Sequence, residues 1–175
     1  MITLVIGGIR SGKTEFSENL LKDKKNKHYI ATMFNFDDET NERIINHRKN
    51  RGDKFITLES LKLEEDFSKV QNAILDDVGN LINNLIFEDK EADLSFENKY
   101  KIITSLKDKF DRLIQNFKSK EKKLVIVTNE VGLTLVSEYK IGRFFQDING
   151  EINKFLADNS DEVYFMLVGQ AVKIK

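Results

Sequence analysis

The pattern that most constrains this sequence lies near its start and has the form G-x-x-x-x-G-K-T of a phosphate-binding loop. It consists of Gly7, Gly8, Ile9, Arg10, Ser11, Gly12, Lys13 and Thr14. The apolar, β-branched run 2–6 before it predicts a buried strand, and the spacing of Phe16 and Leu20 after it predicts a helix. In such a unit the loop N–H groups and the helix N-terminus face a polyphosphate. We therefore expect the chain to bind a nucleoside triphosphate.

Two side chains of this motif have predicted chemical roles. Lys13 is expected to reach the β- and γ-phosphates, and the Thr14 hydroxyl is expected to be a ligand of Mg²⁺. Gly7 and Gly12 allow backbone angles that a side chain would forbid. Lys13 is thus a candidate catalytic residue and Thr14 a candidate metal ligand.

Composition narrows the class of protein. The 175 residues predict a single domain, 1–175, and the net charge of −1 leaves no broad basic surface for nucleic acid. No signal peptide is recognised and no apolar run approaches about 18 residues, so we expect a cytoplasmic protein without membrane insertion. The absence of cysteine excludes disulfides and thiol chemistry.

Strand patterns alternate with helix patterns along the chain. Further strands are expected at 28–32, 55–58, 73–75, 124–128, 163–168 and 171–174, and helices up to 51 and at 61–70, 81–86, 96–117 and 141–156. This alternation predicts an α/β fold. We expect a three-layer P-loop NTPase domain of the RecA-like kind, with a doubly wound, mostly parallel sheet that ends in an antiparallel C-terminal edge strand.

Polar residues follow two of the predicted strands. The strand at 73–75 runs into Asp76 and Asp77, which resembles the acidic group found near Mg²⁺ in P-loop enzymes. The strand at 124–128 runs into a polar turn that begins at Asn129. Ligands of open α/β sheets bind at this carboxyl edge. Both segments are therefore candidate parts of the site.

Three functions remain after the P-loop is recognised: a small-molecule kinase or nucleotidyltransferase, a switch GTPase, and an ATP-driven motor. The chain lacks the Asn-Lys-x-Asp sequence of a switch GTPase, and it lacks the size or basic tract of a motor. Its two histidines differ in setting. His28 enters a strand and is expected to be structural, whereas His47 lies among basic residues that favour a neutral, nucleophilic imidazole. An exposed surface histidine is the alternative for His47.

Taken together, the motifs resemble those of the bifunctional adenosylcobinamide kinase/adenosylcobinamide-phosphate guanylyltransferase family, over nearly the whole chain. The matching segments are Gly7 to Thr14, Tyr29-Ile30-Ala31-Thr32, Arg43 to Arg48, Thr57-Leu58-Glu59, Asn129-Glu130-Val131-Gly132, and Gly142 to Asn153. A P-loop alone indicates only a superfamily, but this ordered set is far more specific.

The resemblance implies two reactions. In one, the γ-phosphoryl group of ATP or GTP passes to the hydroxyl of adenosylcobinamide. In the other, His47 attacks the α-phosphorus of GTP, pyrophosphate leaves, and the bound GMP passes to adenosylcobinamide phosphate. Catalytic roles thus fall to His47 and Lys13. The alternative is a P-loop small-molecule kinase in which His47 is inert and no guanylyl transfer occurs.

The resemblance also implies a GTP-binding set beyond the loop. Its members are Thr32, Met33, Phe34, Arg48, Lys49, Asn50, Arg51, Glu59 and Asp76. For Asp76 a contact with guanine competes with the Mg²⁺ role, and both stay open. A homotrimer is implied as well. Departures from the family pattern include Asp77 and Gly79, where Cys and Thr are more usual, and Gln146, where Arg is frequent.

Overall fold

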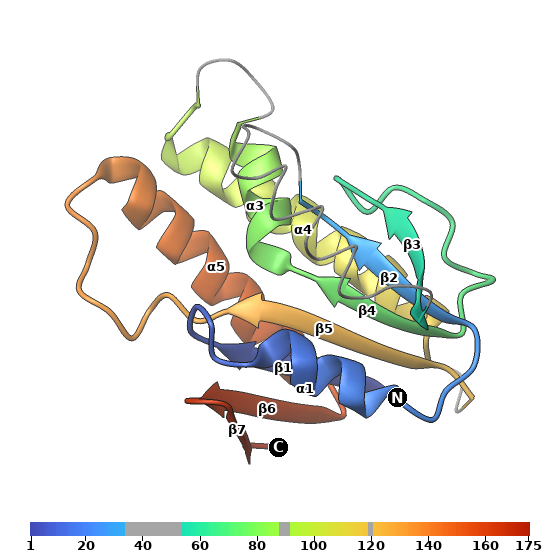
Figure 1. The fold of residues 1–175 in the computed structure, drawn as a ribbon. Coiled ribbons are helices and arrows are strands. Elements are labelled where there is room, and N and C mark those ends of the chain that lie inside the picture. The colour runs from blue at the N-terminus through green and yellow to red at the C-terminus, as the bar shows by residue number, and fades with distance from the viewer. Residues whose placement is uncertain (34–53, 88–91, 119–120) are drawn as a thin grey trace.

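The structure, a computed structural model, describes residues 1–33, 54–87, 92–118 and 121–175. The predicted helical segment up to 51 therefore lies outside the described residues. The elements, with the labels of Figure 1, are β1 Ile2–Gly7, α1 Lys13–Leu20, β2 Lys27–Ala31, β3 Ile56–Glu59, β4 Asn72–Asp76, α3 Val78–Ile86, α4 Phe96–Asn116, β5 Lys123–Asn129, α5 Lys140–Asp158, β6 Glu162–Leu167 and β7 Gln170–Lys173.

In the described ranges the strands form one sheet of seven, in the order β3-β2-β4-β5-β1-β6-β7. All neighbouring pairs are parallel except β6 and β7, which are antiparallel. The predicted α/β fold with an antiparallel C-terminal edge strand is therefore confirmed. The phosphate loop follows β1, and the predicted acidic residues lie at the end of β4. Because β5 lies between these strands, the two segments are two strands apart at the same edge of the sheet.

Helices cover both faces of the sheet (Figure 1). On one face α1 packs on a smaller core that includes Val5, Val125 and Val127. On the other face α3, α4 and α5 pack on a larger core that includes Leu4 and Ile126. Because adjacent strand residues point to opposite faces, the continuous apolar runs of β1 and β5 supply both cores. This explains why these two strands were plain in the sequence.

One predicted element is wrong. The helix expected at 61–70 is absent, and these residues form an irregular loop with a single tight turn, in which the Val70 N–H donates to the Phe67 carbonyl over 3.0 Å. Leu63 has φ 55°, outside the helical region, and its N–H donates to the Ser60 hydroxyl over 3.1 Å. A side chain thus takes up a donor that a helix would give to a carbonyl. Leu63, Phe67 and Val70 are buried, so the apolar spacing that imitates a helix reflects this packing.

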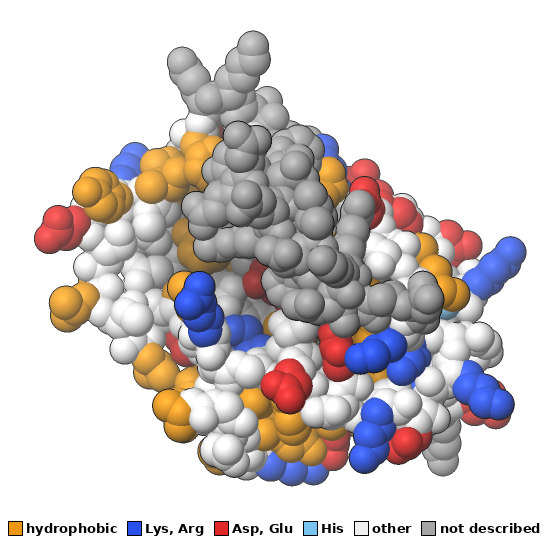
Figure 2. Space-filling model, in the orientation of Figure 1, with side chains coloured by type: hydrophobic (Ala, Val, Ile, Leu, Met, Phe, Trp, Pro, Cys, Tyr) orange, Lys and Arg blue, Asp and Glu red, His pale blue; other side chains and the backbone are white. Residues whose placement is uncertain are grey.

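The surface carries charges of both signs among exposed apolar residues (Figure 2). Hydrophobic side chains gather at the left of this view, where Figure 1 places the connection from β5 to α5. In that connection Leu133, Leu135, Val136 and Tyr139 are all at least three-quarters exposed. No helix in the described ranges combines the length and the hydrophobicity needed to span a bilayer.

Candidate functional site

The phosphate loop is built by close approach of the backbone. A Cβ at Gly7 would stand 2.7 Å from the carbonyl oxygen of Met166 in β6, nearer than real side chains come. Gly12 has φ 89°, in the left-handed region, and forms the N-cap of α1. From the β6–β7 turn, the Gly169 N–H donates to the Ser11 carbonyl over 3.2 Å. The strand on one side therefore holds the loop in shape.

Lys13 lies over this loop. Its Nζ donates to the carbonyl oxygens of Gly7 at 3.1 Å and Gly8 at 2.7 Å. Burial lowers the pKa of the Lys13 ammonium, and the Asp77 and Asp76 carboxylates oppose that shift. Thr14 follows in the first turn of α1 and is half-buried. The described residues thus bring a buried cation and a hydroxyl to one helix N-terminus, where anions are favoured.

Asp76 and Asp77 lie at the end of β4. The Tyr29 hydroxyl of β2 donates a short hydrogen bond to Asp76. Asp77 accepts from the Asn80 N–H at 2.8 Å, as N-cap of α3, and from the Asn129 side chain at 2.7 Å. Burial, with the neighbouring Asp76 charge, raises the pKa of Asp77 to about 6. Two carboxylates from β4 therefore stand within electrostatic reach of Lys13.

The other predicted site residues that the structure describes are Thr32, Met33 and Glu59, and they lie at the ends of β2 and β3. In the parallel register Ala31 pairs with Glu59, so Thr32 and Glu59 lie at neighbouring strand ends. Thr32 is fully buried, and its hydroxyl donates to the Asp77 carbonyl at 2.8 Å. Glu59 is exposed and Met33 half-buried. The Thr32 hydroxyl is therefore engaged with the backbone beside the acidic pair, while the Glu59 side chain lies at the surface.

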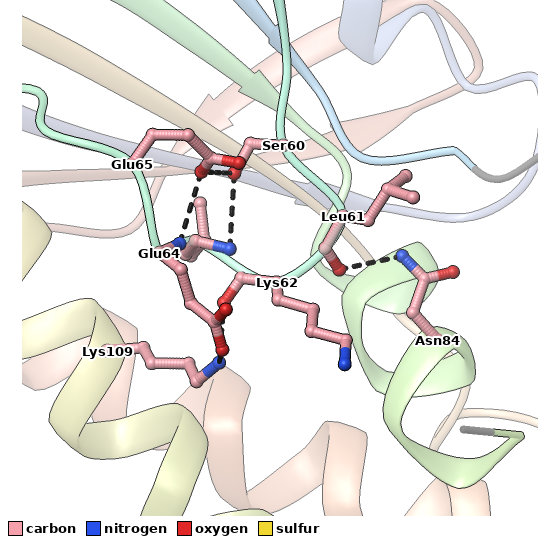
Figure 3. Close-up of polar contacts among 8 residues, drawn as sticks. Ser60, Leu61, Lys62, Glu64, Glu65, Asn84 and Lys109 are labelled. Carbon is pink, nitrogen blue, oxygen red and sulfur yellow. Dashed lines mark hydrogen bonds and ion pairs between the residues drawn. The ribbon is translucent and has the colours of Figure 1, made fainter. Parts of the chain in front are cut away.

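A network of hydrogen bonds holds the chain just after Glu59 (Figure 3). The Ser60 hydroxyl donates a short hydrogen bond to Glu65. Lys109 of α4 donates to the Lys62 carbonyl at 2.7 Å and to Glu64 at 2.9 Å. The bond between Ser60 and Glu65 lies within the loop that follows β3, and the bonds of Lys109 fasten this loop to α4.

The structure describes one of the two histidines, His28. His47 lies outside the described residues, as do Phe34, Arg48, Lys49, Asn50 and Arg51 of the predicted GTP-binding set. His28 is in β2, with Nδ1 at 3.1 Å from the Asn26 carbonyl oxygen. The pairings of β2 with β4, β4 with β5 and β5 with β1 place His28 at the level of Ile2. This level is at the edge of the sheet opposite the phosphate loop. Five residues of strand, about 16 Å, separate these levels.

Sequence reasoning did not find three of the contacts at this edge. They are the Tyr29–Asp76 hydrogen bond, the Asn129–Asp77 hydrogen bond, and the Asn84 side chain that reaches the carbonyls of Thr32 and Leu61. Of the three donors, Asn129 had a signal as the first residue of a polar turn at the ligand-binding edge, Tyr29 had one only as part of a family motif, and Asn84 had none. The partner of Asn129 could not be identified because the sheet order brings them together.

Comparisons with known proteins give matches over all or nearly all of this chain. A family model described as cobinamide kinase / cobinamide phosphate guanyltransferase matches residues 3–174. The chain is 35% identical over 184 residues to the bifunctional adenosylcobalamin biosynthesis protein CobU of Escherichia coli, with 100% of each chain covered. It is 34% identical over 181 residues to the protein of the same name from Salmonella typhimurium, again with 100% of each covered.

A solved structure from Pyrococcus horikoshii OT3 is similar to this one with a TM-score of 0.51. The identity is 9%, and the alignment covers 99% of this chain and 85% of that chain. At this identity the likeness shows the fold alone. It supports the same α/β architecture that the strand order establishes.

Proposed function

The chain belongs to the cobinamide kinase / cobinamide phosphate guanyltransferase family, and we propose that a single phosphate loop serves both of its reactions. It is thus an enzyme of cobalamin biosynthesis. The proposed acceptors are adenosylcobinamide for phosphorylation and adenosylcobinamide phosphate for guanylyl transfer. The observation that carries the proposal is the loop 7–14, which holds Lys13 within electrostatic reach of two carboxylates at one edge of the sheet.

In the kinase reaction the acceptor hydroxyl oxygen attacks the γ-phosphorus of ATP or GTP, and the hydroxyl proton is released to solvent. The bond from that phosphorus to the β–γ bridging oxygen breaks, and the nucleoside diphosphate leaves. Lys13 exchanges its bonds to the Gly7 and Gly8 carbonyls for bonds to the phosphates, where it stabilises the charge that builds up on the leaving oxygens. The remaining loop N–H groups hold the phosphates in place.

In the guanylyl reaction the neutral imidazole of His47 attacks the α-phosphorus of GTP. Pyrophosphate leaves, held by the same loop and Lys13, and a phosphorus–nitrogen bond joins GMP to the histidine. A phosphate oxygen of adenosylcobinamide phosphate then attacks that phosphorus and the bond to nitrogen breaks, which regenerates the imidazole. We assign nucleotide contacts to Met33, which follows β2 next to the acidic pair, and to Glu59, one strand further along the same edge. We assign further contacts to Phe34, Arg48, Lys49, Asn50 and Arg51.

Mg²⁺ fits the donors at this edge. The described residues hold no group of three or more acidic, His or Cys side chains that could form a metal cage. Mg²⁺ usually binds through one or two carboxylates together with substrate phosphates. Thr14 is the proposed protein ligand and Asp76 a second candidate, and the ion would neutralise phosphate charge. For Asp76, guanine is the other proposed partner, because a carboxylate can accept from N1–H and the 2-amino group.

Two finer proposals concern the protein as a whole. We propose a homotrimer, supported by the family resemblance and by the exposed apolar side chains between β5 and α5, Leu135 among them. We propose that the enzyme works in the cytoplasm, where its nucleotide substrates are found.

The experiment that tests this function is covalent labelling with α-labelled GTP, followed by denaturing electrophoresis. The wild-type protein should retain label and release pyrophosphate, and the adduct should be labile in acid and stable in base, as a phosphoramidate is. His47→Ala and His47→Asn should take no label but should still phosphorylate adenosylcobinamide, because that reaction needs no covalent intermediate. His28→Ala is the matched control and should label normally. Label retained by His47→Ala would mean that another residue is the nucleophile.

Labelling should also depend on pH. It should fall as pH drops below the imidazole pKa, for which the reference is about 6.5, because the protonated ring has no lone pair to give. A protein that phosphorylates its acceptor but takes no label at any pH would be the simpler kinase.

A further inference from the structure

We propose that Tyr29 is a positioning residue for phosphoryl transfer, which holds the Asp76 carboxylate in the orientation that the nucleotide or its Mg²⁺ requires. The inference rests on the proposed function in one respect, because that function places Asp76 on the nucleotide or its metal ion. The contacts that carry it lie in β2, β4 and α1, which the structure describes in full.

The Tyr29 side chain reaches Asp76 across two neighbouring strands. β2 and β4 lie side by side (Figure 1), and their register pairs Tyr29 with Ile74 and Ala31 with Asp76. Tyr29 and Ile74 both belong to the core beneath α1, and Asp76 follows Ile74 by two positions, on the same face of the strand. The Tyr29 hydroxyl donates a hydrogen bond to Oδ2 of Asp76. The tyrosine thus reaches from the middle of β2 toward the carboxyl edge of the sheet, where ligands bind.

The ring of Tyr29 is anchored independently of its hydroxyl. Tyr29 is 2% exposed and packs in the same core as Val125 and Val127. Its ring meets that of Phe55 edge-on, with centroids 6.0 Å apart and an angle of 81° between the ring planes. Phenylalanine would keep these ring contacts. What tyrosine adds at this position is the hydroxyl, and that hydroxyl is bonded to Asp76.

The bond from Tyr29 leaves one carboxylate oxygen of Asp76 for a ligand. Asp76 is half-buried, and among the described residues its Oδ1 accepts no hydrogen bond. The carboxylate lies within electrostatic reach of the Lys13 ammonium, where its charge opposes the lowering of the Lys13 pKa by burial. Because Oδ2 is held by the hydroxyl, Oδ1 is presented in one orientation at the edge of the sheet that Lys13 shares.

Loss of the hydroxyl should weaken the role of Asp76 without removing its charge. The terminal torsion of an aspartate is broad, so a carboxylate without a fixed partner samples many orientations. A group that acts on bound substrate loses rate when its geometry is relaxed. The phosphate loop should keep its shape, since its contacts come from Met166 and Gly169 on the other side. The effect of the hydroxyl should therefore pass through Asp76 alone.

The test uses Tyr29→Phe, Asp76→Asn and the double variant in the full chain. Tyr164→Phe is the matched control, because Tyr164 lies in β6 on the same face of the sheet and packs its ring on Phe16 of α1. Each protein is assayed for phosphorylation of adenosylcobinamide with GTP and with ATP. Binding of β,γ-imido-GTP in the presence of Mg²⁺ is measured by titration calorimetry, and melting curves check the fold.

We expect Tyr29→Phe to lower kcat/KM for phosphorylation with GTP by about three- to tenfold, the usual worth of one hydrogen bond. The loss should be smaller than in Asp76→Asn, because the carboxylate is still present. With ATP, Tyr29→Phe should follow Asp76→Asn, whether that variant loses rate or keeps it. The double variant should be no slower than Asp76→Asn alone, since the hydroxyl acts through the carboxylate. Tyr164→Phe should change neither rate.

Other results would overturn the proposal. Additive losses in the double variant, or a Tyr29→Phe protein that does not fold, would show that the hydroxyl serves the fold and not Asp76. Wild-type rates in Tyr29→Phe or in Asp76→Asn would exclude positioning.

Nucleotide binding separates this proposal from the proposed function. If the wild type does not phosphorylate adenosylcobinamide, the assigned acceptor is wrong, and the affinity for β,γ-imido-GTP then decides alone. Tyr29→Phe should weaken that affinity by about threefold or more, with no further loss when it is added to Asp76→Asn. Equal affinity in Tyr29→Phe and the wild type would then overturn the positioning role.

Discussion

The Asn129 side chain donates a hydrogen bond of 2.7 Å to the Asp77 carboxylate, and so joins the end of β5 to the N-terminus of α3. The same carboxylate caps α3 through the Asn80 N–H. Asn129 is paired in the sheet with Gly7, the first residue of the phosphate loop. The Asn129 side chain therefore connects β5, the strand next to the phosphate loop, with the acidic residues at the end of β4.

The buried charge of Asp77 should reduce stability above neutral pH. Its folded pKa of about 6 is above the ordinary 3.8, so the folded state binds this proton more tightly than the unfolded state does. The resulting cost is absent below about pH 4 and complete above about pH 6. In thermal melts from pH 4 to pH 8, the free energy of unfolding of Asp77→Asn should therefore rise relative to that of the wild type by on the order of 1–3 kcal/mol. Parallel curves for the two proteins would contradict this.

Lys13→Ala should slow both reactions. The lysine is the cation of the shared phosphate site, and loss of one such transition-state contact costs about 10²–10³ in rate. Stability should change little, because among the described residues Lys13 donates hydrogen bonds to loop carbonyls alone, those of Gly7 and Gly8. Steady-state rates and melting temperatures check this, with the exposed Lys22→Ala as control. A variant that loses one reaction and keeps the other would exclude a shared site.

Asp76→Asn should lower GMP labelling at least tenfold, because both roles considered for this carboxylate place it on the nucleotide. Phosphorylation with ATP separates the two roles. A carboxylate that holds Mg²⁺ affects ATP and GTP alike, whereas one that accepts from guanine leaves the reaction with ATP near its wild-type rate. Initial rates with the two donors at several Mg²⁺ concentrations make the distinction. Full labelling in Asp76→Asn would remove Asp76 from the site.

Light scattering of the purified chain should give a mass near three times 20.3 kDa. The physical reason is the set of exposed apolar side chains between β5 and α5, since contiguous exposed apolar surface marks protein contacts. Substitution of Leu135, 93% exposed, by Asp should shift the mass toward that of a monomer if this surface is part of the contact. A wild-type monomer at micromolar concentration would contradict the trimer.

Local patterns in the sequence determined much of this protein. The phosphate loop can be recognised from eight consecutive residues, 7–14, because its glycines, lysine and threonine are neighbours in the chain, although contacts from Met166 and Gly169 complete its shape. The strands β1 and β5 were equally plain, since a strand buried on both faces must be a continuous apolar run. Both features follow from backbone geometry and burial within one short segment, and the structure bears them out.

Only the tertiary structure decided which distant residues meet. The sequence could place Asp77 and Asn129 at strand ends but could not say that β4 and β5 are neighbours, because strand order is set by packing of the whole sheet. The apolar spacing at 61–70 predicted a helix, and contacts from Ser60 and Lys109 gave a loop. Asn84 carried no signal at all, since its two partners come from chain segments that only the folded sheet brings within 2.9 Å of one amide.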